Sequence, residues 1–210
     1  MAIVLKYLEY GLGSTLSFVK GHDSKTFCKG PAFSSIKEPT IKVCCTECGE
    51  SGSALTMEHS GLNEGVKDKI PELSWECSDP NVKEYMVIVE DPDVPVPMSA
   101  THGLFFNIPA TRNSIGPADV DTFREAFKSK QNIPDGQIKF AKNTLGSVYR
   151  GPGPPRGHGP HRYFYQVIGL NAPIDASKMS NVPSRSEVEK QVEGKVVAWG
   201  IWIGTFEKAF

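Results

Sequence analysis

The chain has 210 residues, an ordinary length for one domain, and the sequence predicts a single domain over residues 1–210. Its 23 Lys and Arg residues nearly balance 24 Asp and Glu residues, which argues against a nucleic-acid partner, and no apolar run reaches the length of a membrane span. The 20 glycines and 16 prolines indicate many turns and exclude an all-helical bundle.

The N-terminal region predicts an amphipathic helix. Apolar residues recur there at every third or fourth position: Leu5, Leu8, Leu12, Leu16 and Val19. Gly11 and Gly13 each weaken a helix by about 1 kcal/mol relative to alanine, so we expect the helix to depend on docking against the core. That role is favoured over membrane or partner binding because the polar face is not especially basic.

From Thr40 onward, short β-rich runs alternate with turn residues. The predicted strands are Thr40–Cys45, Ala54–His59, Tyr85–Glu90, His102–Ile108, Ile138–Ala141, His161–Leu170 and Lys195–Thr205. Several are continuously apolar, which is typical of strands buried on both faces of one central sheet. A capping-box pattern at Ser186–Glu189 predicts a short helix that ends near Gly194. The order of elements favours a mostly β, α+β fold of the sandwich type.

Five cysteines are present, and three of them lie within Cys44–Cys48. The Cys45–Cys48 spacing is that of a zinc knuckle, but a structural zinc site needs four ligands and no second such pair exists. The first ten residues lack the features of a secretory signal. We therefore expect a cytoplasmic protein whose cysteines are free thiols in a surface loop, with no bound metal.

Two loops place ionisable groups beside rigid turns. Glu90–Pro95 follows an apolar strand, and His102 opens the next one. A Gly/Pro-rich loop that begins at Gly151 leads to His161–Tyr163 at the start of another apolar strand. Such loops hold a defined shape and let backbone N–H groups converge on an anion. Each ionisable residue alone is more typical of a structural role, but together they predict the polar wall of a pocket.

These motifs resemble those of the phosphatidylethanolamine-binding protein family. The matching residues are Asp91-Pro92-Asp93-x-Pro95, then His102, then Gly151-Pro-x-Pro-Pro, and finally Gly159-Pro160-His161-Arg162-Tyr163. The ending Gly204–Glu207 is similar to the Raf-kinase-inhibitor-like branch, and the N-terminal helix with Gly21–Asp23 resembles fungal members. The resemblance covers residues 32–208 as the core and leaves residues 1–30 as an N-terminal helical extension.

The resemblance implies a β-sandwich-like fold with a large central sheet, an N-terminal helix, a short C-terminal helix and a small anion pocket. The family's ligand-binding positions fall on Asp91, His102, Gly151, Pro154, Pro155, His161 and Tyr163. An aspartate beside a histidine keeps the imidazole charged, which suits a phosphate or carboxylate. Ala100 and Thr101 stand where many family members have an aromatic residue and a histidine, so we expect a wider mouth of the pocket. Arg150 stands where a small residue is common and is expected to add positive charge or to occlude the pocket. Arg162 is expected to form a structural pair with Asp93.

Three functions follow from these residues. Binding of an anionic small molecule or phospho-group is favoured, and the family implies a kinase or protease as a possible protein partner. An enzyme is the second, because fungal members are encoded with polyketide pathways, including those that dimerise units into maleidrides. Asp91, His102 and His161 suit cofactor-free acid–base chemistry by a cyclase, lyase or isomerase, although no activated nucleophile is evident. The third function is a metal site, with carboxylate and imidazole ligands from Asp91, Asp93, His102 and His161. It is disfavoured because the pocket of the family holds anions.

Overall fold

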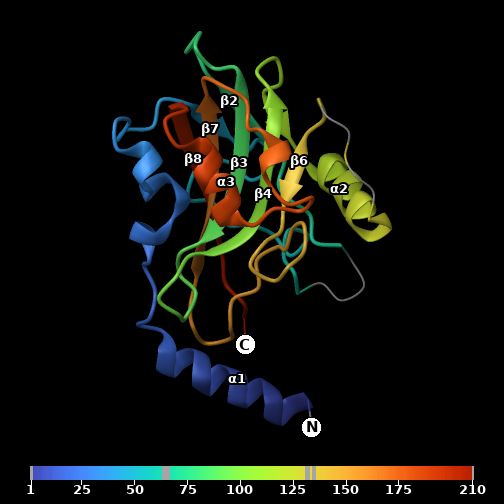
Figure 1. Ribbon diagram of the computed structural model, residues 1–210. Coiled ribbons are helices and arrows are strands. Elements are labelled where there is room, and N and C mark those ends of the chain that lie inside the picture. The colour runs from blue at the N-terminus through green and yellow to red at the C-terminus, as the bar shows by residue number, and fades with distance from the viewer. Residues whose placement is uncertain (1, 63–66, 131–132, 134–135, 210) are drawn as a thin grey trace.

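The computed structural model describes residues 2–62, 67–130, 133 and 136–209, and within them the strands form two antiparallel sheets (Figure 1). The smaller sheet has the order β1-β2-β5 and the larger has the order β6-β4-β3-β7-β8. The strands are β1 (Lys42–Cys44), β2 (Leu73–Glu76), β3 (Glu84–Asp91), β4 (Ala100–Pro109), β5 (Ser114–Ile115), β6 (Lys139–Ala141), β7 (His161–Leu170) and β8 (Val196–Phe206). The α-helices are α1 (Ala2–Leu16), α2 (Pro117–Ser129) and α3 (Arg185–Val192), with 3₁₀ turns η1 (Asp23–Lys25), η2 (Phe27–Lys29), η3 (Pro31–Phe33) and η4 (Ala176–Lys178).

The larger sheet is covered on both faces, which explains the continuous apolar runs of its strands. Tyr85, Val87 and Val89 of β3 point into one core, which they share with β2 and α2. The alternate residues Met86 and Ile88 point into a second core, which they share with η2, η3 and α3. Because successive side chains of a strand point to opposite faces, both sets are buried only when each face has its own cover. The predicted sandwich-like, mostly β fold with a central sheet is confirmed.

The predicted strands are confirmed with one exception. Residues 54–59 form no strand, since only Ala54 bridges to another strand and the His59 N–H donates to the Thr56 carbonyl in a turn. The sequence interpretation missed β2, β5 and α2. It also placed the capping box of α3 two residues late, because Ser184 is the N-cap and Glu187 closes the box.

The N-terminal helix forms as predicted, but its expected docking through the leucine stripe is wrong. Leu5, Leu8 and Leu12 remain 59%, 58% and 66% exposed, and α1 lies apart from the two sheets at one end of the molecule (Figure 1). The helix contacts the body through its opposite side, where Gly13 approaches the backbone of Arg156. No helix in the described residues is long and apolar enough to cross a membrane.

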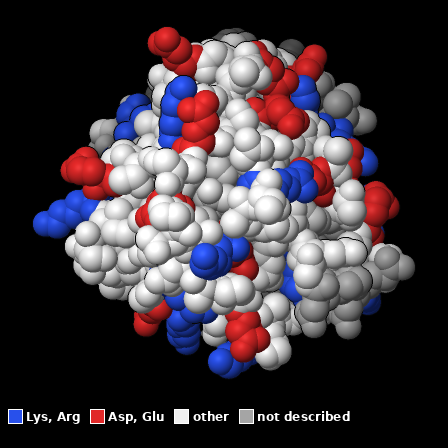
Figure 2. Space-filling view, turned by 90° about the horizontal axis from the view of Figure 1, so that it is seen from above, with Lys and Arg blue, Asp and Glu red and all other residues white. Residues whose placement is uncertain are grey.

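Basic and acidic side chains are interspersed on the surface at the end of the molecule that is turned to the viewer in Figure 2. This mixture is what the near-zero formal charge of −1 leads one to expect. Charges of both signs at close spacing partly cancel and give this face a weak field.

Candidate functional site

The register of the central sheet brings the two predicted loops together at one end. β3 and β7 are antiparallel neighbours with Glu90 paired to Phe164, so Asp91 at the end of β3 lies near the start of β7, where its carboxylate reaches the His161 ring. On the other side of β3, Asp91 pairs with Ala100 of β4, two residues before His102. Residues far apart in sequence thus meet at adjacent strand ends, as the sequence analysis predicted for the central sheet.

A cavity of about 320 Å³ opens at this end. All of the predicted ligand-binding residues line it: Asp91, His102, Gly151, Pro154, Pro155, His161 and Tyr163. Further lining comes from Leu62, Val94, Pro95, Ala100, Thr101, Asn143, Thr144, Leu145, Arg150 and Gly153. The sequence analysis did not identify Leu62 or the Asn143–Leu145 turn, because they come from loops with no motif of their own. The side chains of Leu62 and Leu145 make the wall of the cavity partly apolar.

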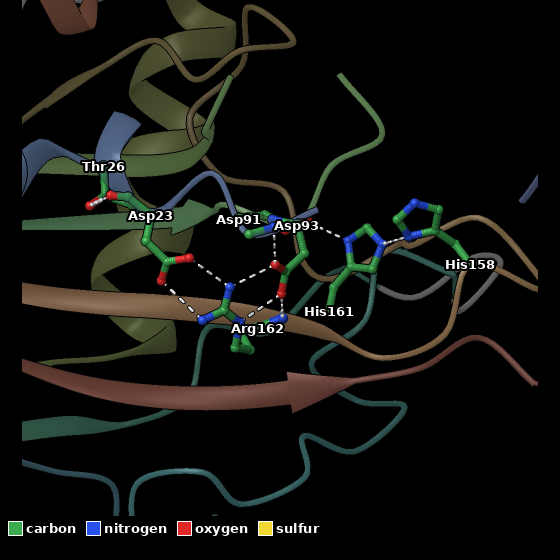
Figure 3. Close-up of polar contacts among 8 residues, drawn as sticks. Asp23, Thr26, Asp91, Asp93, His158, His161 and Arg162 are labelled. Atoms are coloured by element: carbon green, nitrogen blue, oxygen red, sulfur yellow. Dashed lines mark hydrogen bonds and ion pairs between the residues drawn. The ribbon is translucent and has the colours of Figure 1, made fainter. Parts of the chain in front are cut away.

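Asp91, His161 and His158 form a buried chain of hydrogen bonds (Figure 3). His161 Nδ1 lies 2.8 Å from Asp91 Oδ2, and His161 Nε2 lies 2.7 Å from His158 Nδ1. Burial and the neighbouring His161 lower the pKa of His158. The Asp91 carboxylate only accepts, so His161 Nδ1–H donates to it, and a second hydrogen bond joins His161 Nε2 to His158 Nδ1.

This chain changes the role expected of His161. Both ring nitrogens are occupied by protein partners, so neither is free to contact a ligand directly while the bond to His158 holds. The sequence analysis had assigned the ligand contact to His161 and had not identified His158. A second histidine three residues before a strand carries no signal of its own, because only the loop geometry aims it at His161.

His102 is the histidine with an open nitrogen. Its Nδ1 lies 2.6 Å from the Arg150 carbonyl oxygen, which only accepts, so this nitrogen carries the proton. Burial lowers the pKa of His102, and the nearby Asp91 carboxylate opposes this shift only in part. The neutral ring therefore has a lone pair on Nε2. Its edge-to-face contact with Tyr163, at 5.2 Å between centroids, holds its orientation.

Tyr163 supplies a buried polar group on the same wall. Its hydroxyl lies near Asp91 and the backbone of Gly153, yet it has no hydrogen-bond partner of good geometry among the described residues. Burial, followed by the charge of Asp91, raises the pKa of Tyr163 well above its usual value, so the hydroxyl keeps its proton. An unpaired buried hydroxyl is costly, and a ligand oxygen in the cavity would satisfy it.

The Gly/Pro loop is rigid, but its first N–H does not point at the cavity as an anion nest would require. The Gly151 N–H donates to Asp68 Oδ2 at 2.7 Å. A side chain at Gly151 would collide with the His59 carbonyl, which explains the glycine. Arg150 lines the cavity, with its Nη2 2.5 Å from the Gly61 carbonyl and its Nε 3.5 Å from Asp68. The loop shapes the wall of the cavity. The positive charge of Arg150 is partly neutralised by Asp68.

Arg162 joins Asp93 to the segment after α1 (Figure 3). It donates from Nε and Nη2 to Asp93 at 2.9 and 2.8 Å, and from Nη1 and Nη2 to Asp23 at 2.9 Å each. Burial alone would raise the pKa of Asp93, but the hydrogen bonds from Arg162 outweigh burial and lower it. The geometry is that of the structural pair expected from the sequence, extended by Asp23 to a second carboxylate.

The cysteine cluster differs from the expected surface loop. Cys45 is buried in the core, and ligand atoms of Cys45, Glu47 and Cys48 lie within 4.8 Å of one another. Glu47 accepts hydrogen bonds from Lys69 Nζ and the Glu72 N–H, both at 2.7 Å. With the carboxylate so engaged, two thiols remain as donors, fewer than a structural zinc site needs.

The fold and the site define a class of protein. The family model described as "Phosphatidylethanolamine-binding protein" matches residues 46–207, and the chain belongs to that family. The crystal structure of YbcL from Escherichia coli, described as a member of the mammalian PEBP family, aligns with a TM-score of 0.64 and 26% identity. That alignment covers 80% of this chain and 99% of YbcL.

Two fungal relatives match almost the whole chain. Both carry the name "Phomoidride biosynthesis cluster protein B". One, from a fungal species, is 38% identical over 210 residues, which is 100% of this chain and 99% of the relative. The other, from Talaromyces stipitatus, is 38% identical over 208 residues, or 99% of this chain and 84% of the relative. The similarity therefore includes the N-terminal 45 residues, which lie outside the family match.

Proposed function

We propose that the cavity binds an organic acid that has an anionic head and an apolar body. The observation that carries this proposal is the combination of His102, with its open Nε2, and the unpaired Tyr163 hydroxyl on one wall of a partly apolar cavity. The Tyr163 hydroxyl would donate a hydrogen bond to a carboxylate or phosphate oxygen, and His102 Nε2 would donate a second one when the ring is doubly protonated. Leu62, Leu145 and Val94 would pack against the apolar body.

The relatives indicate which acids to examine first. Because both fungal relatives are named for the phomoidride cluster, we propose that this chain acts in a polyketide pathway on a carboxylate or cyclic anhydride. A larger cavity of about 500 Å³ lies beside α2, but its described lining has no histidine and no carboxylate. The smaller cavity is therefore the better candidate, since it combines an apolar wall with convergent polar groups.

Calorimetric titration tests the binding proposal with maleate, an alkyl-substituted maleate, inorganic phosphate and phosphoethanolamine as probes. At acidic pH, where His102 is doubly protonated, the His102→Ala variant should lose about 1.5–3 kcal/mol of binding free energy, the usual value for a hydrogen bond to a charged group. His22→Ala is the matched control, because His22 does not line the cavity. Equal affinities of wild type and His102→Ala would contradict the proposal. The ranking of the four probes separates a head-group site from a site for organic acids.

The pH dependence of binding gives a second check. Only a doubly protonated His102 can donate from Nε2, since its Nδ1–H is held by Arg150. Because burial lowers the pKa of His102, this form is populated at acidic pH. Affinity for a permanently ionised anion should therefore fall as the pH rises through the pKa of His102 and level off once the ligand-bound pKa is passed.

Acid–base catalysis is a second candidate function, favoured by the same open nitrogen. A neutral His102 has the lone pair of a general base, and Nε2 would take a proton from a carbon next to an anhydride or acid carbonyl to leave an enolate. The Tyr163 hydroxyl would donate a hydrogen bond to the enolate oxygen. His102→Gln should then abolish deuterium exchange at that carbon while binding of inactive analogues persists. Exchange that is unchanged in this variant would reject catalysis and leave binding intact.

A further inference from the structure

The helix α1 presents an apolar face to solvent instead of to the core. The outward side chains Ile3, Val4 and Tyr7 are 71%, 61% and 60% exposed, and they continue the exposed leucines at positions 5, 8 and 12. Lys6 and Glu9 are the only charged residues of the helix, and both lie on its less exposed side together with Gly13. The polarity of α1 is thus reversed relative to an ordinary surface helix.

The inward side of α1 is already satisfied by contacts with the body. Glu9 accepts a hydrogen bond from Lys208 Nζ at 2.5 Å and lies 3.4 Å from Arg156 Nε. Gly13 and Gly157 allow the helix and the 156–158 backbone to approach closely. These contacts fix the helix on the body, so the outward face remains exposed in the isolated chain.

We propose that a second copy of this chain covers the outward face, with α1 packed against α1 of the partner in a two-fold dimer. The six apolar side chains expose on the order of 100 Å² each, or roughly 600 Å² per chain, the upper end for ordinary monomers. A helix pair covers mainly Val4, Tyr7 and Leu8, which lie around Gly11, so the dimer removes less than the roughly 1,200 Å² that both faces expose and has the size of a weak, concentration-dependent interface. The face carries no charge and is therefore complementary to itself, as a two-fold contact requires.

Gly11 gives independent support for a helix as the occupant. A side chain at Gly11 would meet nothing within 4 Å in the described part of the chain, so no intramolecular contact explains this glycine. Glycine within a helix costs about 1 kcal/mol relative to alanine. On a contact face, however, it allows two helix backbones to approach closely, as small residues do in packed helix pairs. Gly13 is explained by the body, and Gly11 is explained by a partner helix.

A membrane surface fits the same face less well. Helices that lie in a bilayer interface carry a basic polar face, whereas the polar side of α1 holds Glu9 in ion pairs with Arg156 and Lys208. The helix lies outside the family match but inside the full-length match to one phomoidride relative. The proposed dimer is therefore expected for this subgroup and not for the family core.

Sedimentation velocity of the full chain tests the dimer between about 1 and 100 µM, a range that covers weak interfaces. The wild type should show twice the 23.0 kDa mass of one chain, with the dimer fraction rising with concentration. L8E/L12E should be monomeric throughout. Met57→Glu is the matched control, because Met57 is also an exposed apolar residue but does not belong to α1, and this variant should stay dimeric.

The Gly11→Leu variant shows whether loss of the dimer can occur without unfolding of the helix. Leucine favours the helix more than glycine, and a Cβ at this position has nothing within 4 Å in the described part of the chain, so the variant should fold at least as stably yet lose the dimer. Circular dichroism of each variant checks that the helix remains. A wild-type monomer at all concentrations would overturn the proposal, and so would a dimer that survives in both α1 variants. Vesicle binding by a monomeric wild type would assign the face to a membrane instead.

Discussion

At the scale of single residues, the site depends on His158, a histidine that does not itself line the cavity. His158 is fully buried, and its Nδ1 lies 2.7 Å from His161 Nε2. The Asp91 carboxylate holds the proton on His161 Nδ1, and the hydrogen bond to His158 at the other edge of the ring keeps the ring against Asp91. The role is one of positioning, because His158 acts on the site through His161.

We expect His158→Ala to destabilise the protein by about 1–3 kcal/mol, since the buried His161 Nε2 loses its hydrogen-bond partner. His158→Asn retains an N–H donor and should recover part of this loss. Urea denaturation measures the stability, and long-range ¹H–¹⁵N spectra report the tautomer of His161. If both variants matched the wild type in stability and tautomer, the positioning role would be refuted.

At the scale of secondary-structure elements, α1 is held by close backbone approach rather than by apolar packing. Gly13 lies against the Arg156 carbonyl and the His158 N–H, where a Cβ atom has no room. Because His158 is hydrogen-bonded to His161, which lines the cavity, the 156–158 loop that holds α1 also contacts the site.

Gly13→Ala should lift α1 from the loop, whereas Gly11→Ala meets no obstacle within its own chain. Hydrogen–deuterium exchange measures the difference: the 156–158 amides should exchange faster in Gly13→Ala and at the wild-type rate in Gly11→Ala. Alanine favours the helix equally at both positions, so the pair separates the contact from helix propensity. Unchanged exchange of the 156–158 amides in Gly13→Ala would contradict the conclusion that the close approach of Gly13 holds α1 against this loop.

At the scale of the whole molecule, a buried carboxylate connects the central sheet to its cover. Glu90 of β3 accepts hydrogen bonds from the Phe27 N–H, Gln166 Nε2 and Arg185 Nε, at 2.7, 2.8 and 3.1 Å. These partners belong to η2, β7 and α3, so one side chain joins a neighbouring strand of the sheet and two elements of its cover. Burial raises the pKa of Glu90, although Arg185 opposes the shift.

Removing that counterion should produce a pH-dependent loss of stability. An acid with a raised pKa binds its proton more tightly in the folded state, so stability falls as the pH rises from the unfolded to the folded pKa. In Arg185→Met the pKa of Glu90 rises further and the fall extends to higher pH. We expect a deficit of about 1–3 kcal/mol at pH 8 that shrinks toward acidic pH, where Glu90 is protonated in both proteins. Urea denaturation across this pH range measures it, and a deficit independent of pH would assign the effect to packing.

The sequence by itself determined the central strands, the motif residues at their ends and the family resemblance. Continuous apolar runs such as Met86–Val89 and turns restricted by proline and glycine are local properties, so they can be read without the fold. The pairing of Asp93 with Arg162 was also foreseeable, because the planar guanidinium suits a fixed carboxylate.

Only the tertiary structure decided how these residues are used. His158 occupies His161, and Asp68 takes the Gly151 N–H, because loops distant in sequence meet at the strand ends. The same is true of α1, whose leucine stripe has the period of a docked helix but faces solvent. Periodicity gives the apolar face of an element, whereas the partner of that face depends on long-range packing.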